Sequence, residues 1–148
     1  MTKIVDLINS LPDMLPLKPA TEVQITDAEL QLRVRFADEY KEYLKAFGAI
    51  MADGIELTGI TKSEHRNVVS LTKKERELNS KVPNTMYVIE NTCVDGIIIW
   101  QDTEGIVYQT TPDTTPTKIA PSLYGYITNQ LELSRYMQVE KSPKSDKL

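Results

Sequence analysis

The chain has 148 residues, of which 41% are hydrophobic and 26% are charged, and its formal net charge is −4. No apolar run reaches the roughly 18 residues of a membrane span, and the acidic balance argues against general nucleic-acid binding, which needs basic patches. The single cysteine, Cys93, excludes an internal disulfide and favours a reducing, cytoplasmic location. We expect one domain over residues 1–140 and a flexible polar tail over residues 141–148.

The first half of the chain has the spacing of helices. Thr2 is placed to cap a first helix that ends before Pro12. The stretch Thr26-Asp27-Ala28-Glu29 matches a capping box and predicts the start of a second helix. Beyond it, aromatic residues and leucine recur every three or four positions and predict a third helix, which Gly48 ends. Its apolar face consists of Phe36, Tyr40, Tyr43, Leu44 and Phe47.

The second half changes to the pattern of strands. Short strands are predicted over residues 55–60 and 67–71, and a second capping box at Thr72 opens a short helix. Three runs rich in Ile, Val, Tyr and Trp follow, separated by glycine-containing turns, at 86–90, 96–101 and 106–110. They predict an antiparallel β-meander. A last helix is expected from Ser122, so the order predicts an α+β fold with N-terminal helices, a meander sheet and a C-terminal helix.

No catalytic or metal-binding motif is present in the sequence. The only histidine, His65, lies in a polar stretch that is typical of an exposed loop. Cys93 is best interpreted as a structural or incidental thiol, and a small enzyme that pairs it with His65 is the weakest alternative. Residues 102–105 do not form a calcium loop, because the bidentate glutamate that such a loop needs is missing. We therefore expect a protein that is not an enzyme and uses no cofactor or metal.

The acidic residues are unevenly distributed. Residues 82–117 contain five carboxylates and no lysine, arginine or histidine. One interpretation is a solvated edge that keeps the sheet soluble and prevents edge pairing. The other is a surface that attracts a positively charged protein, and nucleases are a suitable class because their clefts must attract phosphates.

Three aromatic residues lie on the same predicted strands, namely Tyr87, Trp100 and Tyr108. Core packing is their commoner use, and some are candidate interface anchors. Alternation places Trp100 on the same face of its strand as Asp102, with Ile99 on the other face. The candidate partner-binding residues are therefore Glu90, Asp95, Trp100, Asp102, Glu104 and Asp113.

Several short motifs between residues 21 and 128 together resemble the SUKH superfamily of Smi/Knr-like domains. The stretch 35–48 resembles its tyrosine-containing helix, with Phe36-Ala37 where Leu-Pro is usual and Phe47-Gly48-Ala49 where Asn-Gly-Gly is common. The segments that resemble the rest of the family are 54–59, 68–72 with Arg76, 82–83, 87–90, 95–96 and 100–103.

The resemblance implies an α+β domain without shared catalytic residues, in many cases an immunity protein (antitoxin). Such a protein neutralises the toxin of a neighbouring gene by occlusion. The chain looks most similar to the YobK type, which is paired with an LXG-type toxin that carries a ribonuclease domain. The expected partner is thus a basic nuclease domain, with no direct binding of nucleic acid or membrane. A scaffold or regulatory protein-binding module is the alternative, and a homodimer through a sheet edge is left open.

Overall fold

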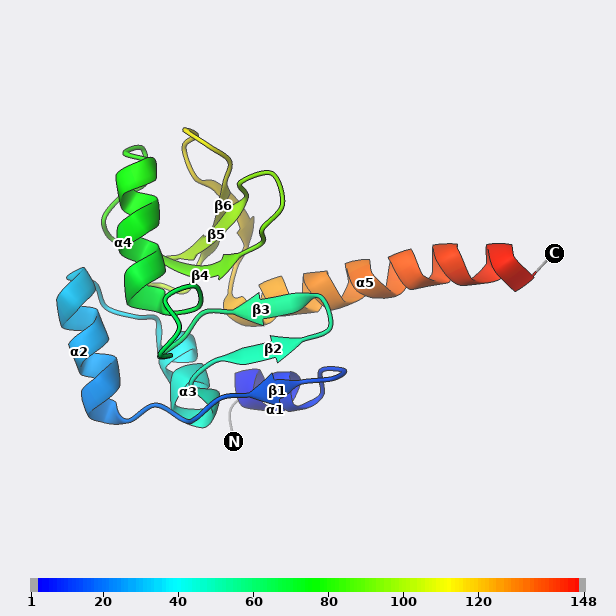
Figure 1. Cartoon of the computed structure of the whole chain (residues 1–148), viewed down its shortest axis with the longest axis horizontal. Helices are drawn as coiled ribbons and strands as arrows, with labels where there is room; N and C mark the ends of the chain where they lie inside the picture. Colours follow the sequence, from blue (N-terminus) through cyan, green and yellow to red (C-terminus); the bar gives the residue numbers. More distant parts are fainter. Residues whose placement is uncertain (1–2, 147–148) are drawn as a thin grey trace.

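A computed structural model describes residues 3–146, with side chains described as far as residue 136. Within this range helices and two antiparallel sheets form an α+β fold, as the sequence predicted (Figure 1). The helices are α1 (Lys3–Asn9), α2 (Glu22–Leu32), α3 (Asp38–Phe47), α4 (Val68–Leu78) and α5 (Leu123–Asp146). The strands are β1 (Leu15–Pro16), β2 (Ile50–Ala52), β3 (Ile55–Leu57), β4 (Tyr87–Asn91), β5 (Ile98–Gln101), β6 (Val107–Thr110) and β7 (Thr117–Ala120).

The larger sheet is the predicted β-meander. Its strands lie in the order β4-β5-β6-β7, and each neighbouring pair is antiparallel. The turns use Gly96 and Gly105 at positive φ, 71° and 98°, which glycine adopts without steric cost. The fourth strand, β7, was missed because its sequence is short and follows a stretch rich in threonine and proline. Pairing with β6 makes it a strand.

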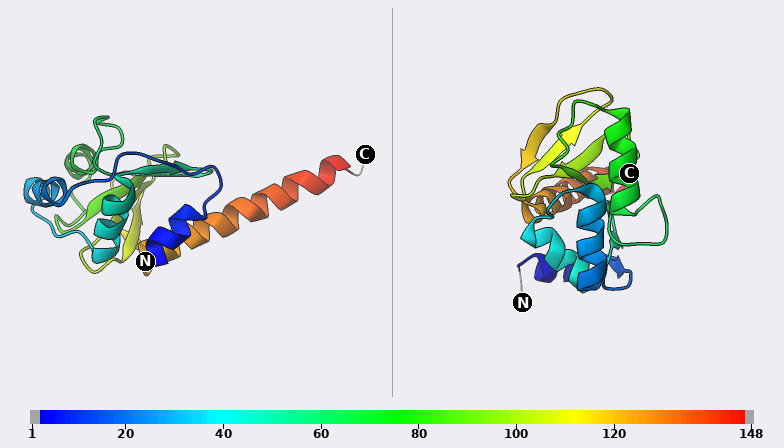
Figure 2. Two further views of the ribbon diagram at one scale, coloured as in Figure 1. Left: turned by 90° about the horizontal axis from the view of Figure 1, so that it is seen from below. Right: turned by 90° about the vertical axis from the view of Figure 1, so that its left-hand side faces the viewer.

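Both faces of the meander are buried. One face packs against α4 in a small cluster made of Leu71, Val82, Met86, Val88, Ile98 and Trp100. The other face, which carries Ile99, belongs to the main core shared with α1, α2, α3 and α5. The two faces inferred from alternation are therefore confirmed. Figure 2 (right) shows α4 lying along the sheet.

Helix α3 lies at the centre of the main core and ends at Gly48, as predicted. Its four buried apolar residues are Tyr40, Tyr43, Leu44 and Phe47. The ring of Tyr40 lies 5.1 Å from that of Tyr87 on β4, and Phe36 contacts Tyr87 edge-on at 4.8 Å. These aromatic contacts join α3 to the meander, and edge-on geometry is a favourable arrangement for such rings.

The start of α2 was predicted five residues too late. The capping box uses Thr21, whose hydroxyl accepts a hydrogen bond from the Gln24 N–H at 3.1 Å while the Gln24 side chain accepts from Thr21 N–H at 2.9 Å. Thr26 is exposed within the helix. Both stretches match the pattern, and the earlier start extends the helix by a turn, so that Ile25 joins its buried face.

The segment 67–71, predicted as a strand, forms the first turn of α4. The Asn67 side chain accepts hydrogen bonds from the N–H groups of Val69 and Ser70, at 2.9 and 3.2 Å, and so caps the helix. The cap and the packing against the meander outweigh the strand preference of the two valines. Thr72, predicted as a cap, is buried inside α4, where its hydroxyl accepts a hydrogen bond from Val88 N–H.

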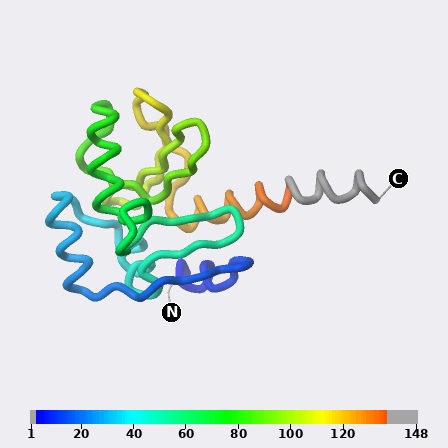
Figure 3. Tube along the Cα trace, in the orientation of Figure 1, coloured from blue at the N-terminus to red at the C-terminus, as the bar shows by residue number. Residues whose placement is uncertain are grey.

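The smaller sheet has the order β1-β2-β3. The stretch that follows α1 runs alongside β2 in the chain trace (Figure 3). Its strand β1 has only two residues, one of them Pro16, so the sequence carries no strand signal there. The predicted cap of α1 at Thr2 lies outside the described residues.

Helix α5 begins after Ser122, as predicted, and the Ser122 hydroxyl accepts a hydrogen bond from Gly125 N–H at 3.0 Å. Its residues Leu123, Tyr126 and Ile127 are buried. Farther along, the helix extends away from the sheets (Figures 1 and 2). It runs to Asp146, into the segment predicted as a flexible tail. Side chains beyond residue 136 and residues 147–148 lie outside the described part of the chain, so flexibility there stays a prediction.

We predict that Gly48→Ala destabilises the protein more than Gly54→Ala does. Both glycines have a positive φ, 74° and 78°, but a Cβ atom on Gly48 would lie 1.9 Å from the Lys18 carbonyl oxygen, whereas one on Gly54 would meet nothing within 4 Å. The expected loss in the free energy of unfolding is about 2–4 kcal/mol for Gly48→Ala and about 1 kcal/mol for Gly54→Ala. Urea denaturation measures both, and equal losses would contradict the close packing at Gly48.

Candidate partner-binding groove

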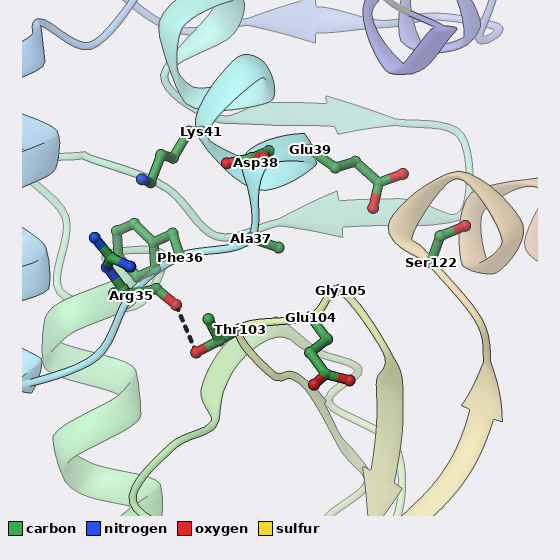
Figure 4. Close-up of a pocket in the computed structure, with 10 residues that line it drawn as sticks. All are labelled: Arg35, Phe36, Ala37, Asp38, Glu39, Lys41, Thr103, Glu104, Gly105 and Ser122. Atoms are coloured by element: carbon green, nitrogen blue, oxygen red, sulfur yellow. Dashed lines mark hydrogen bonds between the residues drawn. The ribbon is translucent and has the colours of Figure 1, made fainter.

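A groove in the described structure has a volume of about 740 Å³. It lies between the start of α3, the turn that joins β5 to β6, and the start of α5 (Figure 4). The residues that line it are Arg35, Phe36, Ala37, Asp38, Glu39, Lys41, Thr103, Glu104, Gly105 and Ser122. Segments far apart in the sequence thus form one concave surface.

Glu39 joins two walls of the groove. Its two carboxylate oxygens accept hydrogen bonds from the N–H groups of Leu123, at 2.7 Å, and Tyr124, at 2.8 Å. These N–H groups lie in the first turn of α5, where helical N–H groups have no intrahelical partner and a negative charge is favourable. Glu39 therefore fixes the start of α5 against the start of α3.

A buried hydrogen-bond network lies beneath the groove. Tyr87 accepts a hydrogen bond from Ala37 N–H at 2.9 Å and donates to the side-chain oxygen of Gln101 at 2.8 Å. The Gln101 amide donates to the Gly105 carbonyl at 3.0 Å and to Glu39 at 3.4 Å. Burial raises the pKa of Tyr87 well above its usual value, so the phenol stays a neutral donor. The network holds the walls of the groove at fixed positions.

The turn between β5 and β6 is ordered by Asp102. One carboxylate oxygen accepts hydrogen bonds from the N–H groups of Glu104 and Ile106, both at 3.0 Å, and the other accepts from the Tyr108 hydroxyl at 3.0 Å. The Thr103 hydroxyl donates to the carbonyl of Arg35 across the groove, at 3.0 Å (Figure 4). Asp102 is thus half-buried and serves the turn, while Glu104 stays exposed at the rim.

The exposed charges of the groove are Arg35, Asp38 and Glu104. Within the described residues none of the three forms an ion pair, whereas Lys41 lies 3.5 Å from Glu29. The two carboxylates come from different walls, α3 and the β5–β6 turn (Figure 4). No histidine or cysteine lines the groove. Its chemistry therefore suits recognition of a charged or hydrogen-bonding partner group.

The sequence analysis identified Glu104 but not the charged residues on the opposite wall of the groove. Arg35 and Asp38 lie just before and at the start of α3, outside the acidic segment, and no local pattern marks them. Only the long-range contact between the start of α3 and the β5–β6 turn brings them to one site. Charge counting along the chain does not find such a site, because it ignores contacts between distant segments.

The acidic residues of the meander do not form one surface. Asp102 and Glu104 lie at the end of the sheet that faces the groove, whereas Asp95 and Asp113 lie in turns at the opposite end. Those two turns adjoin, since a Cβ on Gly96 would lie 2.8 Å from a ring carbon of the proline that precedes Asp113. Asp113 also lies 3.7 Å from the amine of Lys81. A role of these four residues in partner binding stays a prediction.

Glu90 is buried, with 6% of its surface exposed, which corrects its assignment to an open acidic face. Its carboxylate accepts hydrogen bonds from Glu56 N–H at 2.8 Å and from the Tyr126 hydroxyl on α5. Burial raises the pKa of Glu90, with these hydrogen bonds opposing the shift. The side chain links β4 to β3 and to α5 and has no access to a partner.

Trp100 is fully buried, and its assignment as a candidate interface anchor needs the same correction. The indole N–H donates to the Thr110 hydroxyl at 2.9 Å, so its one polar group is satisfied inside the protein. The reason is α4, which packs against this face of the meander, a contact that alternation within one strand does not predict. Core packing is the use that the structure gives to this tryptophan.

A smaller pocket of about 210 Å³ brings together His65 and Cys93, both exposed residues, with Lys74 beside them. The Cys93 thiol lies 3.8 Å from the carbonyl oxygen of Asn91, and no hydrogen bond joins it to His65 among the described side chains. Activation of a thiol needs a base within hydrogen-bonding distance. His65 and Cys93 thus line the same pocket without the hydrogen bond that would activate the thiol.

Within the described residues, no three potential metal ligands from histidine, cysteine, aspartate and glutamate gather at one place. None of the helices there combines the length and the apolar character that crossing a membrane requires.

The helix α3 with its tyrosines, the meander and the closing helix define an α+β domain of the SUKH superfamily, as the sequence motifs indicated. The chain belongs to the family SUKH_5, described as SMI1-KNR4 cell-wall, whose family model matches residues 1–132. Assignment to the YobK type stays a prediction.

No curated protein matches the chain at a significant level. Among solved structures, the crystal structure of a protein from Pseudomonas syringae pv. tomato is similar, with a TM-score of 0.66 and 17% sequence identity. The match covers 85% of this chain and 94% of that chain. At this identity the likeness concerns the fold.

We predict that Glu39→Ala lowers the free energy of unfolding by about 1–2 kcal/mol, because two backbone N–H groups in the first turn of α5, one half-buried and one exposed, lose their acceptor. Glu42→Ala, one turn along α3, is the matched control, since Glu42 forms no hydrogen bond or ion pair in the described structure. Urea denaturation of both variants tests this, and equal stabilities would show that Glu39 does not cap α5.

The stability of the wild-type protein relative to Glu90→Gln is expected to fall as the pH rises above 4.5. The pKa of Glu90 is raised in the folded state, so the folded protein holds this proton more tightly than the unfolded chain does, and ionisation of Glu90 favours unfolding. Urea denaturation at pH 4.5 and pH 7 gives the difference between the two proteins, in which other groups cancel. A difference that does not change with pH would contradict the raised pKa.

Proposed function

We propose that this protein is an immunity protein that binds a positively charged toxin domain through the groove and blocks it by occlusion. The observation that carries the proposal is the pair of exposed carboxylates, Asp38 and Glu104, which flank the groove and have no internal ion-pair partner. Membership of the SUKH superfamily supports the proposal, because members of this superfamily are in many cases immunity proteins.

The rigidity of the groove favours such a role. Asp102 and Thr103 order the β5–β6 turn, so Glu104 is presented from a fixed backbone. A preorganised surface loses little conformational entropy when a partner binds. Exposed carboxylates at its rim speed the approach of a basic protein by electrostatic steering.

The partner that fits this electrostatic pattern is a nuclease domain. Its cleft must attract phosphate groups and is therefore basic, so the exposed carboxylates Asp38 and Glu104, which outnumber the exposed Arg35 at the groove, can approach it and cover it. We propose the ribonuclease domain of an LXG-type toxin, encoded beside the gene of this protein, as the particular partner, in accord with the likeness to the YobK type. Binding takes place in the cytoplasm of the producing cell.

A second candidate is a regulatory protein-binding module. The description of the matching family refers to the cell wall and not to a toxin, and this wording favours the alternative. The groove would then bind a cellular protein without inhibiting a toxin. The neighbouring gene separates the two functions, because only an immunity protein protects cells from the product of that gene.

We expect co-expression with the C-terminal domain of the neighbouring gene's product to rescue growth and to yield a copurifying complex. Glu104→Lys should slow association with this domain by about tenfold at low salt, because it reverses a charge at the groove. The difference should shrink in high salt, since salt screens exposed charges. Stopped-flow fluorescence measures the association rate.

Glu77→Lys, an equal charge change at an exposed position of α4, is the control and should change the rate less. Asp113→Lys tests the opposite end of the meander. A larger effect there than at Glu104 would place the interface away from the groove. Absence of both rescue and complex formation by the wild-type protein would refute the immunity function itself.

A further inference from the structure

Three large apolar side chains are exposed together on the smaller sheet. The exposed fractions are 64% for Leu15, 42% for Leu17 and 40% for Met51. Leu15 lies directly opposite Met51 in the register of β1 and β2, so both side chains point to the same face. Leu17 lies just after β1, but its N–H donates a hydrogen bond to the Ala49 carbonyl at 2.9 Å. The pairing with the chain of β2 therefore continues to Leu17, which shares that face by alternation. We call these three residues the β1–β2 apolar patch.

The patch departs from the pattern of a sheet with one face in the core. Ile50 and Leu57 point to the other face of the same sheet and are buried, with 0% and 1% exposed. The solvent face of such a sheet normally carries polar residues. A contiguous group of exposed apolar side chains on a folded protein indicates an interaction surface.

Carboxylates border one end of the patch. Asp13 precedes β1, and Asp53 lies in the turn between β2 and β3. These two segments adjoin, because Asp53 N–H donates a hydrogen bond to the Pro12 carbonyl at 3.2 Å. Both aspartates are exposed, and neither forms an ion pair within the described residues.

The remaining charges near the patch are fewer or already paired. Glu56 lies opposite Met51 on β3, and its carboxylate is 3.2 Å from the guanidinium of Arg66. Lys18, which is exposed, follows Leu17 at the other end. The unpaired negative charge near the patch therefore belongs to Asp13 and Asp53. An apolar centre with a charged rim is the usual composition of a protein interface.

We propose that the β1–β2 apolar patch is a docking surface for a protein segment that carries both apolar side chains and lysine or arginine. The apolar side chains of the segment cover Leu15, Leu17 and Met51, and its basic side chains pair with Asp13 and Asp53. The patch shares no residue with the groove, so the proposal is independent of the function proposed for the groove.

Two other occupants fit less well. In a symmetric contact with a second copy of the chain, the four unpaired aspartates of the two rims would meet only two Lys18 side chains, so an excess of negative charge would remain in the contact. Addition of a strand to the free edge of the sheet is hindered at β1, because Pro16 has no N–H to donate. The face of the sheet, and not its edge, is therefore the docking site.

Methyl NMR of the full chain, labelled at leucine and methionine, tests the proposal with a synthetic peptide of leucine and lysine as the probe. We expect saturable shifts at the methyl groups of Leu15, Leu17 and Met51. A peptide with glutamate in place of every lysine should bind about tenfold more weakly, because it meets the rim with like charge. Shifts confined to other methyl groups, absence of saturable binding, or equal binding of both peptides would overturn the proposal.

Two matched variants separate the patch from general stickiness. Leu15→Glu should abolish binding of the leucine–lysine peptide, and Leu30→Glu, at an exposed leucine of α2, should leave it unchanged. Asp13→Asn combined with Asp53→Asn should weaken binding several-fold at low salt and preserve the location of the shifts. Equal effects of the two leucine variants, or concentration-dependent broadening of the patch methyl groups without peptide, would refute the proposed occupant. The second result would indicate self-association.

Discussion

The packing of this protein depends on satisfying the hydroxyl groups of tyrosines buried in its core. A buried phenol without a hydrogen bond is destabilising, so each hydroxyl must meet a partner at a defined position. Tyr43 donates to the Thr58 carbonyl at 2.6 Å and accepts from Ile50 N–H at 3.1 Å, while Tyr40 bonds the Thr58 hydroxyl at 2.9 Å. The Thr58 hydroxyl in turn donates to the Val88 carbonyl at 2.8 Å. One helix is thereby fixed to both sheets.

The same requirement shapes the groove. The Tyr87 hydroxyl connects the start of α3 to Gln101, and Gln101 connects to Glu39, which caps α5. The polar side chains beneath the groove thus form hydrogen bonds within the protein and stabilise the fold. The side chains left for recognition are those that extend from this framework, namely Arg35, Asp38 and Glu104. A binding surface of this kind can change its exposed charges while its buried network keeps the shape.

The groove and the β1–β2 apolar patch differ in the contacts that form them. The groove is polar and results from contacts between segments far apart in the sequence. The β1–β2 apolar patch results from the register of two short strands. Its apolar residues stay exposed because the core already covers the opposite face of that sheet. Separate surfaces would allow one small domain to contact two segments of a partner.

The sequence by itself determined the elements that depend on local spacing: the tyrosine-bearing α3, its end at Gly48, the hairpin turns of the meander and the start of α5 at Ser122. It also carried the family motifs. Tertiary structure alone decided that residues 67–71 are helical, that Trp100 and Glu90 are buried, and which carboxylates share a surface. The physical reason is that periodicity and caps act within a few residues, whereas burial depends on which distant element covers each face.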